Sequence, residues 1–468
     1  MCIRDSTYTI REIHRQYVTI DGKKYKLTQV YDLGPAQKIT VSDSVKNGAV
    51  IDFGTYTNTA IPKMTSSAIS TDTNTKMSVA GKNASFKDSI KATNLKASTK
   101  YTLMSVAVDA NTGKAYKDAD GKYVAKNVEF TTGAVKKGTV FPETTASVTF
   151  TGVNTSNVKS RKLVFYEYLV EGSVTKTVSL DSDGKPVEPA NCVAKDASVS
   201  NKAQTVNVIS LETKVLVNST KTNESPAAVN TVTDTVTTHG LIAGESFTIN
   251  STIKVDGKSI GVQSTDFTAE GNDKEVSVVF KDLDLSKLAN KRLSIVTELI
   301  YKNKVILTHN DDGKDLNEEF YTPEMHSNAI DVDTLTKMSK TSETAKFKDT
   351  VDIKNLSTAT QYTLQSIAVD TATGLAYKDA SGKYVVGHEI FTTESTEDNQ
   401  GADRVGATVD IEFTANTKGT NVTQITFYEY LVRGSVDSDI SVDENGYPVR
   451  PANSVSYTHL TLPTKLEV

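Results

Sequence analysis

One block of sequence occurs twice in the chain at a constant separation, and this repeat constrains the fold more than any other feature. The block Phe86–Ile90 (Phe-Lys-Asp-Ser-Ile) returns as Phe347–Val351 (Phe-Lys-Asp-Thr-Val), so Asp88 and Asp349 are 261 positions apart (349 − 88). A more divergent copy, with Asp234 at the corresponding place, lies between them. The 261 residues from one copy to the next therefore hold two units of about 130 residues each, which is an ordinary size for a domain.

Short segments with alternating apolar and polar residues predict that each unit is built of β-strands. In the first unit they are Lys100–Val108, Val124–Thr131, Ala146–Phe150 and Lys162–Val170. Val, Thr, Tyr and Phe dominate these segments, and Gly, Asn, Asp and Pro separate them. The pattern predicts an all-β fold of tandem Ig-like β-sandwich domains.

A carboxylate stands in the most apolar part of one predicted strand. Lys162–Val170 reads Lys-Leu-Val-Phe-Tyr-Glu-Tyr-Leu-Val and contains Glu167. Nearly the same sequence returns at Thr426–Val432 with Glu429, and Ser294–Tyr301 is a weaker copy in which we equate Glu298 with Glu167. Such an acid either faces solvent, as strand alternation allows, or has a role inside the core.

Composition excludes several classes of function. The chain of 468 residues carries a net charge of -5, which argues against a nucleic-acid partner. No apolar run is long enough for a membrane helix. The 6 histidines are scattered, no phosphate-binding loop occurs, and the 2 cysteines have no partner by spacing. We therefore expect no metal site and no cofactor.

The two ends resemble sequencing-adapter read-through and are set apart from the fold. The expected organisation is an adapter-like start (1–6), part of an upstream β domain (7–65), a first sandwich (66–210), a divergent second sandwich (211–325), a truncated third sandwich (326–454) and an adapter-like tail (455–468). Within the upstream piece, Tyr17–Leu27 predicts a hairpin around Asp21-Gly22. We expect the natural protein to extend further at both ends.

The units resemble the VaFE repeats, or Thr-Gln ester-bond domains, of surface-anchored adhesins from Gram-positive bacteria. The resemblance rests on five pieces in a fixed order. In the first unit these are Ile69–Thr73, Asp88–Leu95, Tyr101–Leu103 with Thr112-Gly113, Val164–Leu169 and Gln204–Val206. The resemblance implies CnaB-like sandwiches in which a threonine hydroxyl on the first strand attacks the amide of a glutamine on the last strand, with loss of ammonia.

By this resemblance Thr71 is the nucleophile and Gln204 the acyl donor, while Asp88 and Glu167 are the catalytic acid/base pair. Thr73, two residues further along, is a rival nucleophile because it shares a strand face with Thr71. Strands held in place by the fold give the hydroxyl and the amide a high effective concentration. Burial raises the pKa of a carboxyl group toward the range in which it can act as a general acid or base. The only enzymatic activity expected is this single-turnover self-crosslinking.

Departures from the family pattern distinguish the copies. The family has a histidine eight residues before the glutamine, and the first unit has Asp196 there. The middle unit keeps Thr213, Asp234 and His309 but has no Gln-Thr-Val at its end. The third unit has Val332 at the place of Thr71. Only the first unit therefore carries both predicted bond partners.

We expect an extracellular stalk, anchored to peptidoglycan through a missing C-terminus. Two alternatives remain open. One unit, with the middle one as the candidate, recognises a host matrix protein or a glycan. Alternatively, the stalk is stabilised by a Lys–Asn isopeptide bond between Lys76 and Asn207, with Glu167 as the catalyst, which also releases ammonia but resists base.

Overall fold

The computed structural model describes residues 61–134, 143–158, 161–310, 316–395 and 404–459, and the backbone of five short strands outside these ranges. The short strands are β1 (Ser6–Ile10), β2 (Tyr17–Ile20), β3 (Lys23–Lys26), β4 (Gln37–Val41) and β29 (Thr464–Glu467). Across the described residues, strands are the regular structure except for one 3-10 helix, η1 (Leu316–Glu318). The prediction of an all-β fold is therefore confirmed.

The chain divides into two compact units, Met1–Ile209 and Ser210–Val468, and each is described by itself. In the first unit, β1 pairs with β4 and β2 pairs with β3, both antiparallel. Ile20 lies opposite Lys23, so the strands of the predicted hairpin form as expected. Its two turn residues lie outside the described part of the chain.

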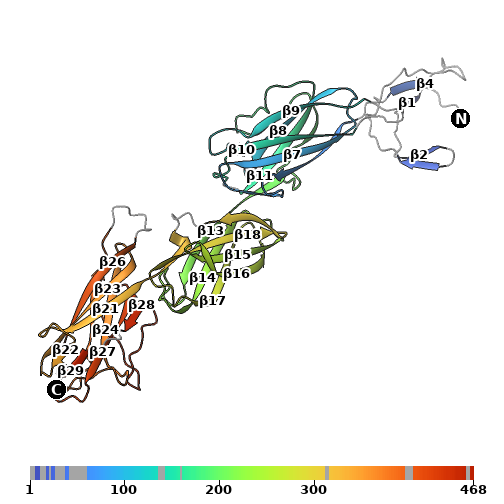
Figure 1. Ribbon diagram of the computed structural model, residues 1–468. Helices are drawn as coiled ribbons and strands as arrows, with labels where there is room; N and C mark the ends of the chain where they lie inside the picture. The colour runs from blue at the N-terminus through green and yellow to red at the C-terminus, as the bar shows by residue number, and fades with distance from the viewer. Residues whose placement is uncertain are drawn as a thin grey trace. The chain divides into compact units, whose positions relative to one another are not determined.

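The first sandwich follows, with two sheets whose strands β7, β8, β9, β10 and β11 are labelled in Figure 1. One sheet has the order β10 (Thr144–Val153), β7 (Ala84–Thr93), β5 (Lys63–Ser70). The other has the order β13 (Thr205–Val217), β11 (Lys162–Glu171), β8 (Lys100–Asp109), β9 (Ala125–Thr131), with β12 (Cys192–Asp196) paired to β11 and β6 (Met77–Val79) paired to β13. The ring of Phe165 packs against those of Phe86 and Phe150, at centroid distances of 5.4 and 5.5 Å.

The alternation of β7 determines which of its residues reach this core. Ala84, Phe86, Asp88, Ile90 and Ala92 are buried, and the residues between them are exposed or half-buried. This is the period of two expected for a strand with one face on the core. Asp88 therefore occupies a core position in a series that is otherwise apolar.

The second sandwich begins within β13, whose residues from Ser210 onward pair with β14 (Val229–His239). Its first sheet has the order β17 (Lys274–Asp284), β14, β13. Its second sheet has the order β16 (Lys258–Thr268), β15 (Ser246–Val255), β18 (Lys291–Tyr301), β19 (Lys304–His309), and β20 (Glu319–Thr322) also pairs with β18.

The third sandwich repeats the plan of the first. One sheet has the order β21 (Glu324–Asp331), β23 (Ala345–Ser357), β26 (Arg404–Ala415). The other has the order β22 (Met338–Lys340), β29, β27 (Gln424–Arg433), β24 (Gln361–Asp370), β25 (Val386–Thr392), with β28 (Ser454–His459) paired to β27. Strand pairing thus continues into the tail that we expected to be adapter-derived.

Within the second unit, the second and third sandwiches meet at a buried glutamate. Glu224 is 0% exposed and accepts hydrogen bonds from Tyr362 Oη (2.6 Å), Ser357 Oγ (2.7 Å) and Arg404 Nη1 (3.2 Å). The guanidinium of Arg404 also lies 3.1 Å from the centroid of the Tyr321 ring. A carboxylate removed from water in this way is stabilised only by its partners, so this contact joins the two sandwiches specifically.

Candidate functional site

Four polar side chains lie between the two sheets of the first sandwich, and each is 0% exposed: Asp88, Ser105, Glu167 and Gln204. They come from β7, β8, β11 and the residue before β13. Ser105 lies directly opposite Glu167 in the pairing of β8 with β11. Four chain segments distant in sequence therefore bring one amide and two carboxyl groups into one core.

The contacts within this group connect the amide to a carboxyl. The Gln204 amide nitrogen donates to Glu167 Oε2, and Ser105 Oγ donates to Asp88 Oδ2 at 2.8 Å. Burial, and next the nearby Asp88, raises the pKa of Glu167 well above its ordinary value. Glu167 therefore keeps its proton to a higher pH than an ordinary glutamate does.

One buried oxygen of this group, Gln204 Oε1, has no hydrogen-bond partner among the described residues. The two acids are partners of each other, because a side-chain hydrogen bond links Glu167 to Asp88 and raises the pKa of Glu167. Unsatisfied buried polar atoms are costly and rare in folded proteins. The carbonyl oxygen of the Gln204 amide is therefore the member of the group that packing does not explain.

A hydroxyl from the first strand reaches the same group. Ser66, on β5, is buried, and its Oγ donates to Asp196 Oδ2 at 2.5 Å. Its side chain also lies within hydrogen-bonding reach of Glu167. Asp196 is the register partner of Glu167 across β11 and β12, and its Oδ1 accepts a hydrogen bond from Asn201 Nδ2 at 2.7 Å.

The first strand is held directly against the segment that carries the glutamine. The Ala68 amide nitrogen donates to the Ala203 carbonyl at 3.0 Å. The Lys76 amine donates to the carbonyl oxygens of Ala68 and Ala203, and burial lowers its pKa. The backbone of Asn207, the possible isopeptide partner of Lys76, donates to the Lys76 carbonyl at 2.8 Å.

Thr71 and Thr73, predicted as the nucleophile and its rival on the first strand, both lie beyond the end of that strand. β5 ends at Ser70, and Thr71 is an exposed residue in the turn that follows. The Thr73 hydroxyl bonds to the Met77 carbonyl and to Thr75 within that turn. The strand alternation puts Ser66, not a threonine, at an inward position beside the carboxyl groups.

The second sandwich contains a modified version of this group. Ser251 Oγ donates to Asp234 Oδ2 at 2.8 Å, as Ser105 does to Asp88. The register partner of Ser251 is Thr297, whose hydroxyl also donates to Asp234, at 3.0 Å. Thr297 therefore stands where Glu167 stands, and equating Glu298 with Glu167 was wrong by one residue. Because adjacent strand residues point to opposite faces, half-buried Glu298 lies on the other side and accepts from Asn250.

An acid replaces the glutamine in the second sandwich. Glu318, 1% exposed, accepts a hydrogen bond from Thr213 Oγ1 at 3.3 Å, and His309 Nε2 contacts the same oxygen. His309 is the register partner of Thr297, just as Asp196 is that of Glu167. The second sandwich therefore keeps the hydroxyl and the histidine but offers them a carboxyl group instead of an amide.

The third sandwich keeps the hydroxyl and both carboxyl groups. Asp349 and Glu429 are 0% exposed, and Ser327 Oγ is buried near them. Burial is the main cause that raises the pKa of each acid, and Asp349 raises that of Glu429 further. Val332, expected at the nucleophile position, lies beyond the end of β21 at Asp331. Ser327 is the residue that corresponds to Ser66, 261 positions earlier (327 − 66).

The family described as "T-Q ester bond containing domain" matches the chain at residues 62–208, 209–316 and 323–455. The chain belongs to this family. The three matches correspond to the three sandwiches, so each is a T-Q ester bond domain. A comparison with curated protein sequences gives no match.

Solved structures with similar folds include a bacterial adhesin from Mobiluncus mulieris, described as containing intramolecular disulfide, isopeptide and ester bond cross-links. It is 12% identical, with a TM-score of 0.25 over 57% of this chain and 87% of that chain. A tetra-tandem repeat of a large adhesion protein is 13% identical, with a TM-score of 0.17 over 86% and 90%. The major pilin subunit of Bacillus cereus is 10% identical, with a TM-score of 0.21 over 78% and 90%. Because each TM-score lies below 0.5, these structures add nothing to the family assignment.

A sequence signal for the first-strand hydroxyl exists in all three T-Q domains. The residues Met64-Thr65-Ser66-Ser67-Ala68 and Met325-His326-Ser327-Asn328-Ala329 share the form Met-x-Ser-x-Ala, and Leu211–Val215 has Thr213 at its centre. In the first and third domains the alanine lies opposite the buried aspartate, as Ala68 opposite Asp88. A search for threonine alone passes over both serines.

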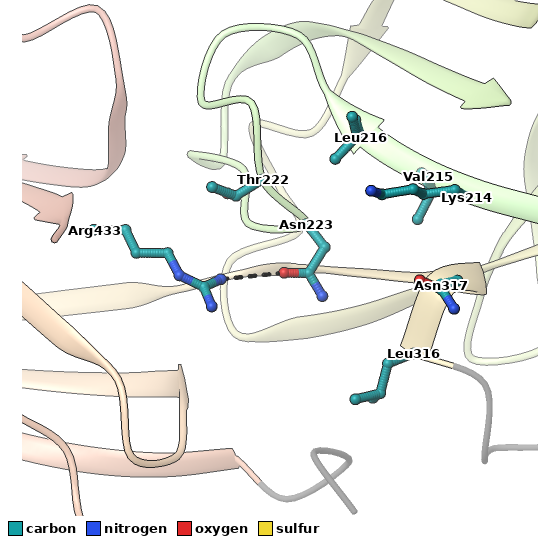
Figure 2. A pocket seen from close by; sticks show the side chains of 8 residues that line it. All are labelled: Lys214, Val215, Leu216, Thr222, Asn223, Leu316, Asn317 and Arg433. Atoms are coloured by element: carbon teal, nitrogen blue, oxygen red, sulfur yellow. Dashed lines mark hydrogen bonds between the residues drawn. The ribbon is translucent and has the colours of Figure 1, made fainter.

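Outside these groups, the described residues offer little for a ligand. Figure 2 shows a hollow between the second and third domains, where Arg433 Nη1 donates to Asn223 Oδ1 at 3.3 Å. Its lining combines side chains such as Leu216 and Leu316 with only two charged residues, Lys214 and Arg433. No group of three or more His, Cys, Asp or Glu in the described ranges is placed to hold a metal ion. No helix found there has the length and apolarity needed to cross a membrane.

Proposed function

We propose that this chain is part of the stalk of a bacterial surface adhesin or pilin-like protein, and that its first T-Q domain cross-links itself through an ester to Gln204. The observation that carries the proposal is the Gln204 amide, fully buried and hydrogen-bonded to Glu167. A glutamine in a core needs partners for its polar atoms, yet here its oxygen has none among the described residues. This arrangement is expected of an acyl donor whose amide carbon is attacked by a nucleophile.

The surroundings of Gln204 fit the chemistry of ester formation. An amide is a poor electrophile, and its nitrogen leaves readily only when it receives a proton. Glu167 supplies that proton, because burial and the nearby Asp88 keep its carboxyl protonated. The sheets fix the reacting strands in contact and exclude water that would hydrolyse the product. The reaction consumes the side chains of the domain itself, so it occurs once and is not enzymatic turnover.

A stalk domain gains mechanical strength from such a bond. The ester joins the first strand of the sandwich to the segment that leads into its last strand, so tension applied at the two ends passes through covalent bonds. Cys192 is a free cysteine, so no disulfide within the described residues performs this role. On this proposal the protein is extracellular and attached to the cell wall, and it presents domains that contact host matrix protein or glycan.

Mass spectrometry of the intact chain tests the cross-link. The wild-type chain is expected to weigh less than its sequence predicts by one molecule of ammonia, and Gln204→Ala is expected to have its full calculated mass. Mild alkali is expected to open the bond and add one molecule of water to the wild type. A wild-type mass equal to the calculated value refutes the ester. A loss of ammonia that persists in alkali and in Gln204→Ala supports the Lys76–Asn207 isopeptide instead.

A further inference from the structure

We infer that the nucleophile of the first domain is a serine, Ser66, and that the side chain which takes its proton is Asp196. This inference rests on the proposed ester and identifies its second partner and its base. It replaces the threonine and the histidine of the family pattern with two residues that the first domain itself places together. The bond formed is therefore a Ser–Gln ester.

The first argument is the position of Ser66 on β5. The inward residues of this strand are Ser66, Ala68 and Ser70, and Ala68 lies opposite Asp88. The hydroxyl of Ser70 has no hydrogen-bond partner among the described residues, whereas that of Ser66 bonds to Asp196. Ser66 is therefore the inward hydroxyl that already faces a proton acceptor.

The second argument is the position of Asp196. Its two oxygens have different partners: Oδ2 accepts from Ser66 at 2.5 Å, and Oδ1 accepts from Asn201 at 2.7 Å. The Asn201 bond fixes the orientation of the carboxylate, and the pairing of β12 with β11 places Asp196 beside Glu167. A base held at hydrogen-bond distance from the hydroxyl meets the geometric requirement for general-base catalysis.

The third argument is that Glu167 connects the two reacting side chains. Gln204 donates to its Oε2, and Ser66 lies within hydrogen-bonding reach of the same carboxyl group. The bond between Ala68 N and Ala203 O holds the two backbones together beside them. The Ser66 hydroxyl and the Gln204 side chain thus both lie beside the same acid, Glu167.

The reaction balances without any further reactant. The Ser66 hydroxyl gives its proton to Asp196 as Oγ attacks the Gln204 amide carbon. The C–N bond of the resulting tetrahedral adduct breaks when Glu167 donates its proton to the nitrogen, and ammonia leaves. The proton on Asp196 then returns to Glu167 through the shared group of carboxyls. The net change is one new C–O bond, one lost C–N bond and one released ammonia.

Five single variants of the full chain test the assignment by intact mass. Ser66→Ala is expected to keep its full calculated mass, while Ser66→Thr and the exposed control Thr71→Ala are expected to lose ammonia as the wild type does. Asp196→Asn is expected to lose ammonia at least about a hundredfold more slowly, which repeated mass measurement after purification records. Asp196→His, which supplies another base, is expected to restore the loss.

Peptide mapping of the wild-type chain makes the test independent of how the variants fold. Trypsin releases residues 64–76 and 203–214 as separate peptides, and the bond is expected to join them. Fragmentation of the joined pair between residues 66 and 71 locates the attachment. Attachment at Thr71 or Thr73 overturns the inference and leaves the proposed ester intact. A wild-type chain with its full calculated mass and no joined peptides refutes the proposed ester itself.

Discussion

Replacing Ser66 by alanine removes the proposed bond but changes the core by only one oxygen atom. Ser66 and Gln204 are 138 positions apart (204 − 66). Closing a loop of this length constrains the unfolded chain by about 5 kcal/mol in the chain-entropy treatment used for disulfides. The hydrogen bond from Ser66 to the Asp196 carboxylate, by contrast, contributes only about 1.5–3 kcal/mol. The expected loss of stability is therefore about 6.5–8 kcal/mol with the ester and about 1.5–3 kcal/mol without it.

Hydrogen exchange of amides in β8 measures this difference in the full chain, because β8 lies in the interior of the sheet that contains β11. In Ser66→Ala, exchange through opening of the first domain is expected to be about 10⁵–10⁶ times faster than in the wild type. Ser327→Ala makes the same atomic change in the third domain, which has no glutamine partner in the described residues, and is expected to leave β24 nearly unchanged. An acceleration of about a hundredfold or less in β8 refutes the ester.

Three further substitutions test the other domains. Glu318→Gln in the second domain gives Thr213 an amide to attack, and intact mass is expected to show a second, slow loss of ammonia. In the third domain, burial and a neighbouring carboxyl raise the pKa of Glu429. The folded domain then binds more protons than the unfolded chain, so its stability, read from exchange in β24, is expected to fall as pH rises above about 4.3, and less so in Glu429→Gln. Glu224→Ala leaves Arg404, whose side chain is 12% exposed, without its carboxylate and is expected to destabilise the junction by about 3–5 kcal/mol.

Each of these substitutions has a matched control. Glu298→Gln makes the same change as Glu318→Gln on the opposite face of the second domain and is expected to show no loss of ammonia; equal masses for both variants contradict the assignment of Glu318. Stability of the third domain that rises between pH 4.3 and neutrality contradicts a protonated Glu429. Glu343→Ala removes an exposed ion pair with Lys418 and is expected to cost at most about 1 kcal/mol.

The strands and their repetition were predictable because the period-two pattern reports directly on burial. The separation of 261 residues between Asp88 and Asp349 reappears in the structure as equal registers, with Ala68 opposite the first and Ala329 opposite the second. The burial of Glu167 was ambiguous from sequence, since alternation with Phe165 and Leu169 fits either face. The structure shows that all three point inward, because β11 is covered by the other sheet.

The nucleophile was not predictable by matching residue types, because the end of a strand depends on pairing that the sequence does not display. Thr71 fits a threonine pattern, but β5 pairs with β7 only from Lys63 to Ser70, and the chain then turns. The same limitation produced the one-residue shift between Glu298 and Thr297. A register error of one residue reverses the face on which a side chain lies, and only the pairing with Ser251 fixes that register.

The first and second domains differ in the groups that surround the buried aspartate. In the second domain, the acyl donor is replaced by Glu318 and the Glu167 equivalent by Thr297. Asp234 there receives hydrogen bonds from two hydroxyls, and its pKa is raised mainly by burial, with nearby Glu318 as a smaller cause. In the first domain Asp88 receives one such bond and shares its surroundings with Glu167, an arrangement that is costly for folding but holds a proton beside the amide. On the proposed mechanism a domain without the amide has no use for that proton, and the second domain has neither the glutamine nor an acid at the position of Glu167.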